Sequence, residues 1–131
     1  MDRKLLGVVI ADQDVAITER IKLILEDEAA IEFMGAPRNL ESTIELIGEK
    51  HPDVVILDIN IGQDTSVDGI MKLLITMRLR FPDLIIMVLS NSVHSRLNCM
   101  AYGADYFFDK SYDFNRIPEV IREIQLKHSN C

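Results

Sequence analysis

Two carboxylates, a hydroxyl and an ammonium group follow four of the short apolar runs in this sequence: Asp12, Asp58, Ser90 and Lys110. Clustered carboxylates repel one another, and Mg²⁺ relieves that repulsion by taking one or two carboxylates together with water and phosphate oxygens. A carboxylate can also attack phosphorus, while a metal and an ammonium group neutralise the transferring charge. Each residue alone could be a helix cap or a loop residue, but the set together favours phosphoryl-transfer chemistry.

The elements that must bring these side chains together alternate along the chain. Five apolar runs are short enough to be strands, namely residues 5–11, 31–34, 54–57, 84–89 and 106–108. Between them, apolar residues recur at helical spacing. We expect Asn39 to cap the second helix, Gly103 to end a helix over residues 92–102, and Pro118 to lie in a first turn. This alternation predicts an α/β fold with a parallel sheet covered by helices on both faces. The carboxyl ends of parallel strands lie along one edge, where sites form.

Composition narrows the classes of function. The chain has 131 residues and a net charge of −7, with 14 basic and 21 acidic residues, which argues against unassisted binding to nucleic acid or anionic membranes. We expect one domain over residues 1–131, with no output domain within the chain. Cys99 and Cys131 lack metal-like spacing and are interpreted as reduced thiols of a cytoplasmic protein.

Several segments resemble, in order and with similar spacing, the receiver domain of bacterial two-component response regulators. The run that ends at Asp12 resembles the first strand and acidic site of that family, and the run that ends at Asp58 resembles its phosphoacceptor strand. Residues 68–69 resemble the Asp-Gly pair that opens its third helix. Residues 88–90 and 103–110 resemble its last two strand ends, with their Ser/Thr and Lys. The resemblance implies a flavodoxin-like (βα)5 sandwich with strand order 2-1-3-4-5.

The resemblance also implies a mechanism. A histidine kinase or phosphotransfer protein would donate a phosphoryl group to Asp58, with Mg²⁺ bound at Asp12 and Asp58. Ser90 and Lys110 would move toward the phosphoryl group, and Phe107, at the aromatic switch position, would turn inward. The surface formed by the fourth helix, fifth strand and fifth helix would then be read by a downstream protein. The implied partners are proteins rather than nucleic acid or membrane, and the chain would be a monomer or weak dimer.

The sequence departs from the family pattern beside the first strand. The family has two adjacent acidic residues, whereas here the second position is Gln13. A neutral carboxamide predicts weaker Mg²⁺ binding, so Gln13 is a doubtful metal ligand, and Asp14 is a possible substitute. Asn60 could offer its backbone carbonyl to the metal and its side chain to an attacking water; the alternative is that Asn60 is a simple turn residue. The loop after Asp58 is three residues longer than usual, expanded over residues 62–67.

Two other interpretations remain open. Gln13 also fits a degenerate receiver that binds proteins without phosphorylation. Residues 12–15, Asp-Gln-Asp-Val, fit the Asp-x-Asp-x-(Thr/Val) signature of haloacid-dehalogenase-type phosphatases, in which Asp12 would be the nucleophile. That interpretation leaves Asp58 without a role, and no further strand after Lys110 supplies the acidic pair that would hold the metal. A signalling domain, rather than a metabolic enzyme, is therefore the main prediction.

Overall fold

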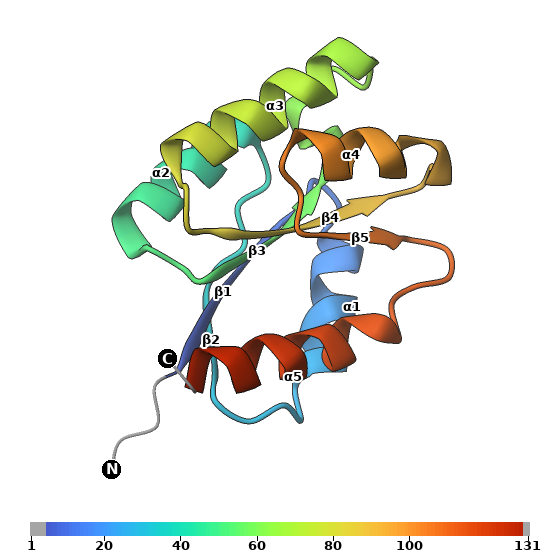
Figure 1. Cartoon of the computed structure of the whole chain (residues 1–131). Helices are drawn as coiled ribbons and strands as arrows, with labels where there is room; N and C mark the ends of the chain where they lie inside the picture. The colour runs from blue at the N-terminus through green and yellow to red at the C-terminus, as the bar shows by residue number, and fades with distance from the viewer. Residues whose placement is uncertain (1–4, 130–131) are drawn as a thin grey trace.

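A computed structural model describes residues 5–129 as a parallel sheet with helices on both faces (Figure 1). The strands of the sheet stand in the order β2-β1-β3-β4-β5, which confirms the predicted order. The strands are β1 (Leu6–Ala11), β2 (Ile31–Gly35), β3 (Val54–Asp58), β4 (Ile85–Ser90) and β5 (Tyr106–Asp109). The helices are α1 (Val15–Leu25), α2 (Leu40–Lys50), α3 (Val67–Arg80), α4 (Arg96–Tyr102) and α5 (Arg116–Ser129), with short 3₁₀ turns η1 (Ile59–Gly62) and η2 (Val93–Ser95).

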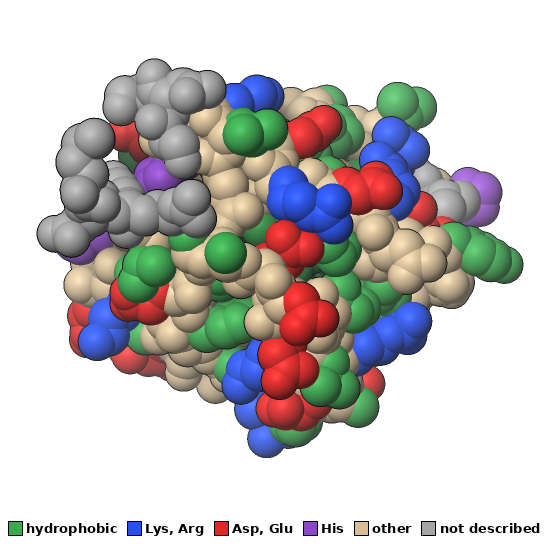
Figure 2. All heavy atoms as spheres, turned by 90° about the horizontal axis from the view of Figure 1, so that it is seen from below, with side chains coloured by type: hydrophobic (Ala, Val, Ile, Leu, Met, Phe, Trp, Pro, Cys, Tyr) green, Lys and Arg blue, Asp and Glu red, His purple; other side chains and the backbone are tan. Residues whose placement is uncertain are grey.

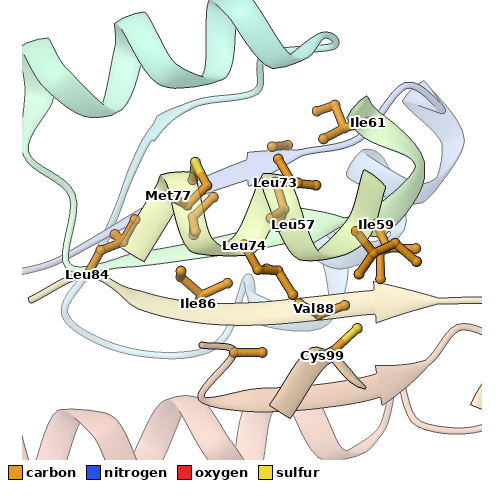
Figure 3. Close-up of a cluster of buried hydrophobic side chains, with 14 of the residues drawn as sticks. Leu57, Ile59, Ile61, Leu73, Leu74, Met77, Leu84, Ile86, Val88 and Cys99 are labelled. Carbon is orange, nitrogen blue, oxygen red and sulfur yellow. The ribbon is translucent and has the colours of Figure 1, made fainter. Parts of the chain in front are cut away.

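The three central strands β1, β3 and β4 are apolar almost throughout because both faces of the sheet are buried. Alternate strand residues enter two separate cores. One core lies under α2, α3 and α4 and includes Val55, Leu57 and Val88 (Figure 3). The other lies under α1 and α5 and includes Val54 and Ile56. A strand buried on both faces has no polar side, which explains the continuous Val/Ile/Leu runs in the sequence.

The helices α1 and α5 are amphipathic, because one side packs on the sheet and the other side faces solvent. Figure 2 shows acidic and basic side chains interspersed with hydrophobic ones on the side of the molecule where α1 and α5 lie. Ile117 and Ile121 of α5 are fully buried against the sheet, while Arg122 on the same helix forms an ion pair with Glu28, 3.2 Å between Nε and Oε1. Within residues 5–129, none of the helices combines the length and hydropathy needed to cross a membrane.

The predicted helix signals act where they were expected. Asn39 caps α2, because its side-chain oxygen accepts a hydrogen bond from the Ser42 N–H at 2.8 Å. Pro118 lies in the first turn of α5, which begins at Arg116 and where its missing N–H costs no helical hydrogen bond.

The prediction for the fourth helix was too long. The stretch expected as one helix over residues 92–102 divides into the 3₁₀ turn η2 and a seven-residue α4. Serine hydroxyls hydrogen-bond locally here, since Ser95 Oγ donates to the Ser92 carbonyl at 2.8 Å. Such local bonds compete with the α-helical ladder and shorten the helix. Gly103 ends α4 at φ 125°, a conformation that favours glycine.

Of the two cysteines, only Cys99 lies within the residues that the structure describes. Cys99 is a free thiol, buried on α4, and burial raises its pKa to about 11. The thiol is therefore protonated and weakly nucleophilic at neutral pH. The expectation for Cys131 concerns a residue outside residues 5–129.

Arg78 joins α3 to the two strands at that end of the sheet. Its guanidinium donates to three backbone carbonyls and one carboxylate, those of Pro82, Leu84, Gly103 and Asp105. The carboxylate of Asp105 also accepts the Ile86 N–H of β4 at 2.8 Å. One side chain therefore satisfies polar groups from the α3–β4 loop and the α4–β5 loop, which would otherwise lose their partners.

We expect Arg78→Met to lower the free energy of unfolding by about 2 kcal/mol, because several carbonyls lose a charged donor while the aliphatic packing is retained. Urea denaturation measures the change. Arg80→Met is the matched control, since it makes the same change at an exposed position in the last turn of the same helix. Equal losses in the two variants would contradict the linking role of Arg78.

Candidate functional site

Strand register brings the predicted site residues to one edge of the sheet. Ala11 of β1 pairs with Leu57 of β3, so Asp12 and Asp58 are the next residues on neighbouring strands. Ser90 of β4 pairs with Asp109 of β5, and the Lys110 N–H donates to the Ser90 carbonyl at 2.9 Å. Four strands therefore deliver two carboxylates, a hydroxyl and an ammonium group to a common edge.

Lys110 is held between the two carboxylates. Its Nζ lies 3.1 Å from Asp12 Oδ2 and 3.1 Å from Asp58 Oδ1. Asp12 is 1% exposed and Asp58 3% exposed, and the Lys110 side chain is 10% exposed. Two negative groups thus share one positive group in a poorly hydrated place, which leaves an excess of negative charge.

The pKa of the Asp12 carboxyl is raised by its surroundings. Burial raises the pKa of the Asp12 carboxyl above its usual value, and the neighbouring Asp58 carboxylate raises it further. The N–H of Asp14, which donates to Asp12 Oδ1 at 2.8 Å, and the Lys110 ammonium oppose the rise in pKa without cancelling it. The site is therefore one where an added cation would be stabilising.

The two oxygens of Asp58 are not equivalent. Oδ1 accepts from Lys110 Nζ and, at 3.1 Å, from the Asn60 N–H at the start of η1. These two hydrogen bonds fix the orientation of the carboxylate, and Oδ2 takes part in neither of them. Asn60 is oriented in turn by η1, where its carbonyl accepts the Gln63 N–H at 2.9 Å.

The residues after Asp12 divide their roles. Asp14 caps α1, because its Oδ1 accepts the Ala16 N–H at 2.9 Å. Gln13 instead reaches across to η1, where its Nε2 donates to the Asn60 carbonyl at 3.3 Å. The side chain that replaces the family's second acid therefore presents its NH₂ group, rather than its oxygen, to the carbonyl that was predicted as a metal ligand.

Ser90 is buried at 2% exposure but directed toward η2. Its Oγ accepts the Ser92 N–H at 3.0 Å and lies 3.2 Å from the Ser92 carbonyl and 3.3 Å from Ser95 Oγ. The hydroxyl is thus engaged in a serine network at the start of α4.

Phe107 lies on β5 and belongs to the core under α3 and α4, with Val88 and Cys99. It is 5% exposed. The Phe107 side chain is therefore buried in the core in this structure, and its proposed role as a switch stays a prediction.

The donor set fits a hard divalent cation. Asp12 Oδ2 is buried and accepts no hydrogen bond, although Lys110 Nζ lies 3.1 Å away. Asp58 and the Asn60 carbonyl add oxygen donors at the same edge, and oxygen is what Mg²⁺ prefers. No cluster of three or more His, Cys, Asp or Glu side chains suited to a metal occurs within residues 5–129, so such a cation would rely on the carbonyl and water beside two carboxylates.

Comparison with known proteins identifies the family of this chain. The family model described as "Response regulator receiver domain" matches residues 8–122. The chain belongs to this family. Receiver domains generally bind Mg²⁺ at their acidic pocket and interact with histidine kinases or phosphotransfer proteins. In this receiver domain, Asp12 and Asp58 are buried carboxylates at the carboxyl edge of the sheet.

Individual relatives are distant and mostly longer. The transcriptional regulatory protein DegU of Brevibacillus brevis is 26% identical over 121 residues, covering 89% of this chain and 49% of that protein. A protein-glutamate methylesterase/protein-glutamine glutaminase of Pseudoalteromonas atlantica is 26% identical over 109 residues, covering 81% of this chain and 28% of that protein. The receiver domain thus spans about half or less of these relatives.

Solved structures share the fold. The isolated REC domain of RcsB from Salmonella enterica serovar Typhimurium, determined in the presence of phosphomimetic BeF₃⁻, has a TM-score of 0.82 at 21% identity, covering 94% of this chain and 90% of that one. A response regulator from Thermotoga maritima has a TM-score of 0.78 at 21% identity, covering 93% and 98%. At such identities the likeness shows the fold alone.

The raised pKa of Asp12 predicts a pH-dependent effect of Asp12→Asn. Because the pKa of Asp12 is raised on folding, ionisation of this carboxyl at neutral pH lowers the free energy of unfolding. The cost is absent at low pH, where the carboxyl is protonated in both the folded and the unfolded chain. We expect Asp12→Asn to raise the free energy of unfolding at pH 7 by about 1 kcal/mol. The gain should shrink as pH falls through the raised pKa toward 3.8.

Urea denaturation across pH, with ¹³C NMR titration of the Asp12 carboxyl, measures both quantities. In Asp58→Asn, the midpoint of Asp12 should fall, because a neighbouring negative charge is lost. A midpoint at or below 3.8 in the wild type would contradict the raised pKa of Asp12, and an unchanged midpoint in Asp58→Asn would contradict the effect of the Asp58 charge.

Proposed function

We propose that this receiver domain is a phosphorylation-controlled signalling switch that accepts a phosphoryl group on Asp58 from a histidine kinase or phosphotransfer protein. The observation that carries the proposal is the pair of buried carboxylates, Asp12 and Asp58, that share the single ammonium group of Lys110 at the carboxyl edge of the sheet. Buried like charges of this kind destabilise a fold, and perturbed buried carboxylates of this kind are typical of functional sites such as those that transfer phosphoryl groups.

Asp58 Oδ2 is the oxygen available for attack, since Oδ1 is held by Lys110 and by the Asn60 N–H. In the step, an O–P bond forms at Oδ2 and the N–P bond of the donor phosphohistidine breaks. The imidazole nitrogen keeps the electron pair of that bond. Mg²⁺, held by Asp12, Asp58 and the Asn60 carbonyl, supplies neutralising charge when bound. Lys110 supplies a second positive charge beside the reacting carboxylate.

Ser90 and Lys110 link the site to the surface. After transfer, the Ser90 hydroxyl would hydrogen-bond a phosphoryl oxygen and so leave its partners Ser92 and Ser95. The start of α4 would lose an anchor at that moment. The surface of α4, β5 and α5 would then change, which is a local charge event biasing a two-state element.

Intact mass spectrometry tests the acceptor role. Incubation with acetyl phosphate and Mg²⁺ should add one phosphoryl group to the wild type, whereas the same reaction with chelator, or with Asp58→Asn, should give none. Asp83→Asn is the matched control, because Asp83 is an exposed aspartate in the turn before β4. An adduct that persists in Asp58→Asn would refute Asp58 as the acceptor.

A second candidate function is a protein-binding module that works without phosphorylation. The contact between Gln13 and the Asn60 carbonyl favours it, because that contact covers a carbonyl that would otherwise serve a metal. The absence of any adduct on the wild type would select this candidate. An adduct that moves with Asp12, lost in Asp12→Asn and kept in Asp58→Asn, would instead select the phosphatase interpretation.

Lys110→Met tests the coupling from the site to α4. The variant keeps the length of the side chain but cannot pair with a phosphoryl oxygen. Asp58 should still accept the group, more slowly because a neutralising charge is lost, while the response of α4 is abolished. We expect the phosphorylation-induced ¹H–¹⁵N shift changes of α4 and of Phe107 to fall to about a tenth or less of the wild-type values, since one charge-assisted hydrogen bond of roughly 1.5–3 kcal/mol is removed.

The same samples provide the check on that result. Intact mass establishes that Asp58 carries the phosphoryl group, and urea denaturation establishes that the variant is folded. Wild-type shift changes in phosphorylated Lys110→Met would show that coupling runs without Lys110.

A further inference from the structure

Both lone pairs of the Asn60 carbonyl oxygen are in use. One accepts the Gln63 N–H at 2.9 Å, a backbone bond that closes η1. The other accepts Nε2 of Gln13 at 3.3 Å, a side-chain bond that spans from the end of β1 to the end of β3. A carbonyl oxygen has two lone pairs, so a cation can approach this oxygen only if one of the two bonds is given up.

The Gln13 bond is the one that can open. The Gln63 bond belongs to the backbone of η1, whereas Gln13 is exposed and reaches the carbonyl by a flexible side chain. The backbone of Gln13 is anchored independently, because its carbonyl accepts from Arg38 Nη2 at 3.3 Å. Releasing the side chain therefore breaks one exposed hydrogen bond and requires no change in the strand.

The orientation of the amide also opposes a cation. Its NH₂ group, with partial positive charge, points at the carbonyl oxygen, and the reversed amide would place oxygen against oxygen. Without a metal the NH₂ orientation is therefore the stable one, and a cation at the Asn60 oxygen would face two donor hydrogens. The hydrogen bond and the bound cation exclude each other.

We propose that Gln13 is a latch on the metal site: it competes with the cation for the Asn60 carbonyl and lowers Mg²⁺ affinity by occupancy, instead of serving as a weak ligand. The proposal rests on the proposed function, since it places Mg²⁺ at Asp12, Asp58 and Asn60. The two explanations of a weak site make opposite predictions. Removing a ligand weakens binding, whereas removing a latch strengthens it.

Gln13→Ala distinguishes them. In a Mg²⁺ titration of the full chain without phosphodonor, followed by ¹H–¹⁵N NMR of the amides around Asp58, we expect Gln13→Ala to bind about two- to fivefold more tightly than the wild type, as loss of one exposed hydrogen bond implies. In the wild type, the side-chain NH₂ signals of Gln13 should shift in step with binding, because the amide leaves the carbonyl.

Gln125→Ala is the matched control. Its amide Nε2 also donates to a backbone carbonyl, that of Ala29 at 2.5 Å, but on α5, a helix that contributes no residue to the acidic site. Its Mg²⁺ affinity should equal that of the wild type. Urea denaturation confirms that each variant is folded before titration.

Weaker or unchanged binding in Gln13→Ala would overturn the latch, and so would the absence of Mg²⁺ binding in every variant. These outcomes are separable from failure of the proposed function, which is scored by the phosphoryl adduct on Asp58. An adduct with unchanged Mg²⁺ affinity refutes the latch alone. A missing adduct, with tighter Mg²⁺ binding in Gln13→Ala, refutes the acceptor role alone.

Discussion

The shared ion pair of Lys110 with Asp12 and Asp58 is the constraint on which the rest of the site depends. Each Nζ–O distance is 3.1 Å, and both carboxylates are buried. One ammonium cannot neutralise two carboxylates, so the site keeps an excess of negative charge. Burial, and in addition the Asp58 charge, raise the pKa of Asp12. The register of the strands aligns the ends of β1, β3 and β5. Because the central strands are buried on both faces, this register is fixed, and it keeps the charged groups together despite the repulsion between the two carboxylates.

The sequence was informative where burial leaves no choice. Strands such as β3 are apolar on both faces, so their position and the carboxylate at their end could be read directly from the run ending at Asp58. It was less informative where local bonds compete. The serines around η2 shortened α4, and nothing in the pattern revealed that Ser90 would face Ser92 and Ser95. The sequence also could not predict where the Gln13 side chain points, because the orientation of a side chain after a strand end depends on the hydrogen-bond partner that η1 provides.

The serine network gives the hydroxyl of Ser90 two competing uses. In this structure it lies in bonding range of Ser92 and Ser95 at the start of α4; in the proposed switch it binds a phosphoryl oxygen. A single buried hydroxyl cannot do both fully, so the chemistry at Asp58 and the conformation of α4 are linked through one group. The loop ahead of α4 is therefore where the charge event would first become a change of shape.

Charge balance explains why a latch at Gln13 would matter. A phosphoryl group on Asp58 adds negative charge to a site where Lys110 already serves two carboxylates, so the phosphorylated state needs a second cation more than the resting state does. An acid in place of Gln13 would attract that cation permanently and add repulsion at rest. A carboxamide adds no charge, and its bond to the Asn60 carbonyl satisfies the oxygen while the metal is absent. Under the proposed latch, Gln13 would lower Mg²⁺ affinity in the resting state, and Mg²⁺ occupancy would then depend more strongly on the arrival of the phosphoryl group.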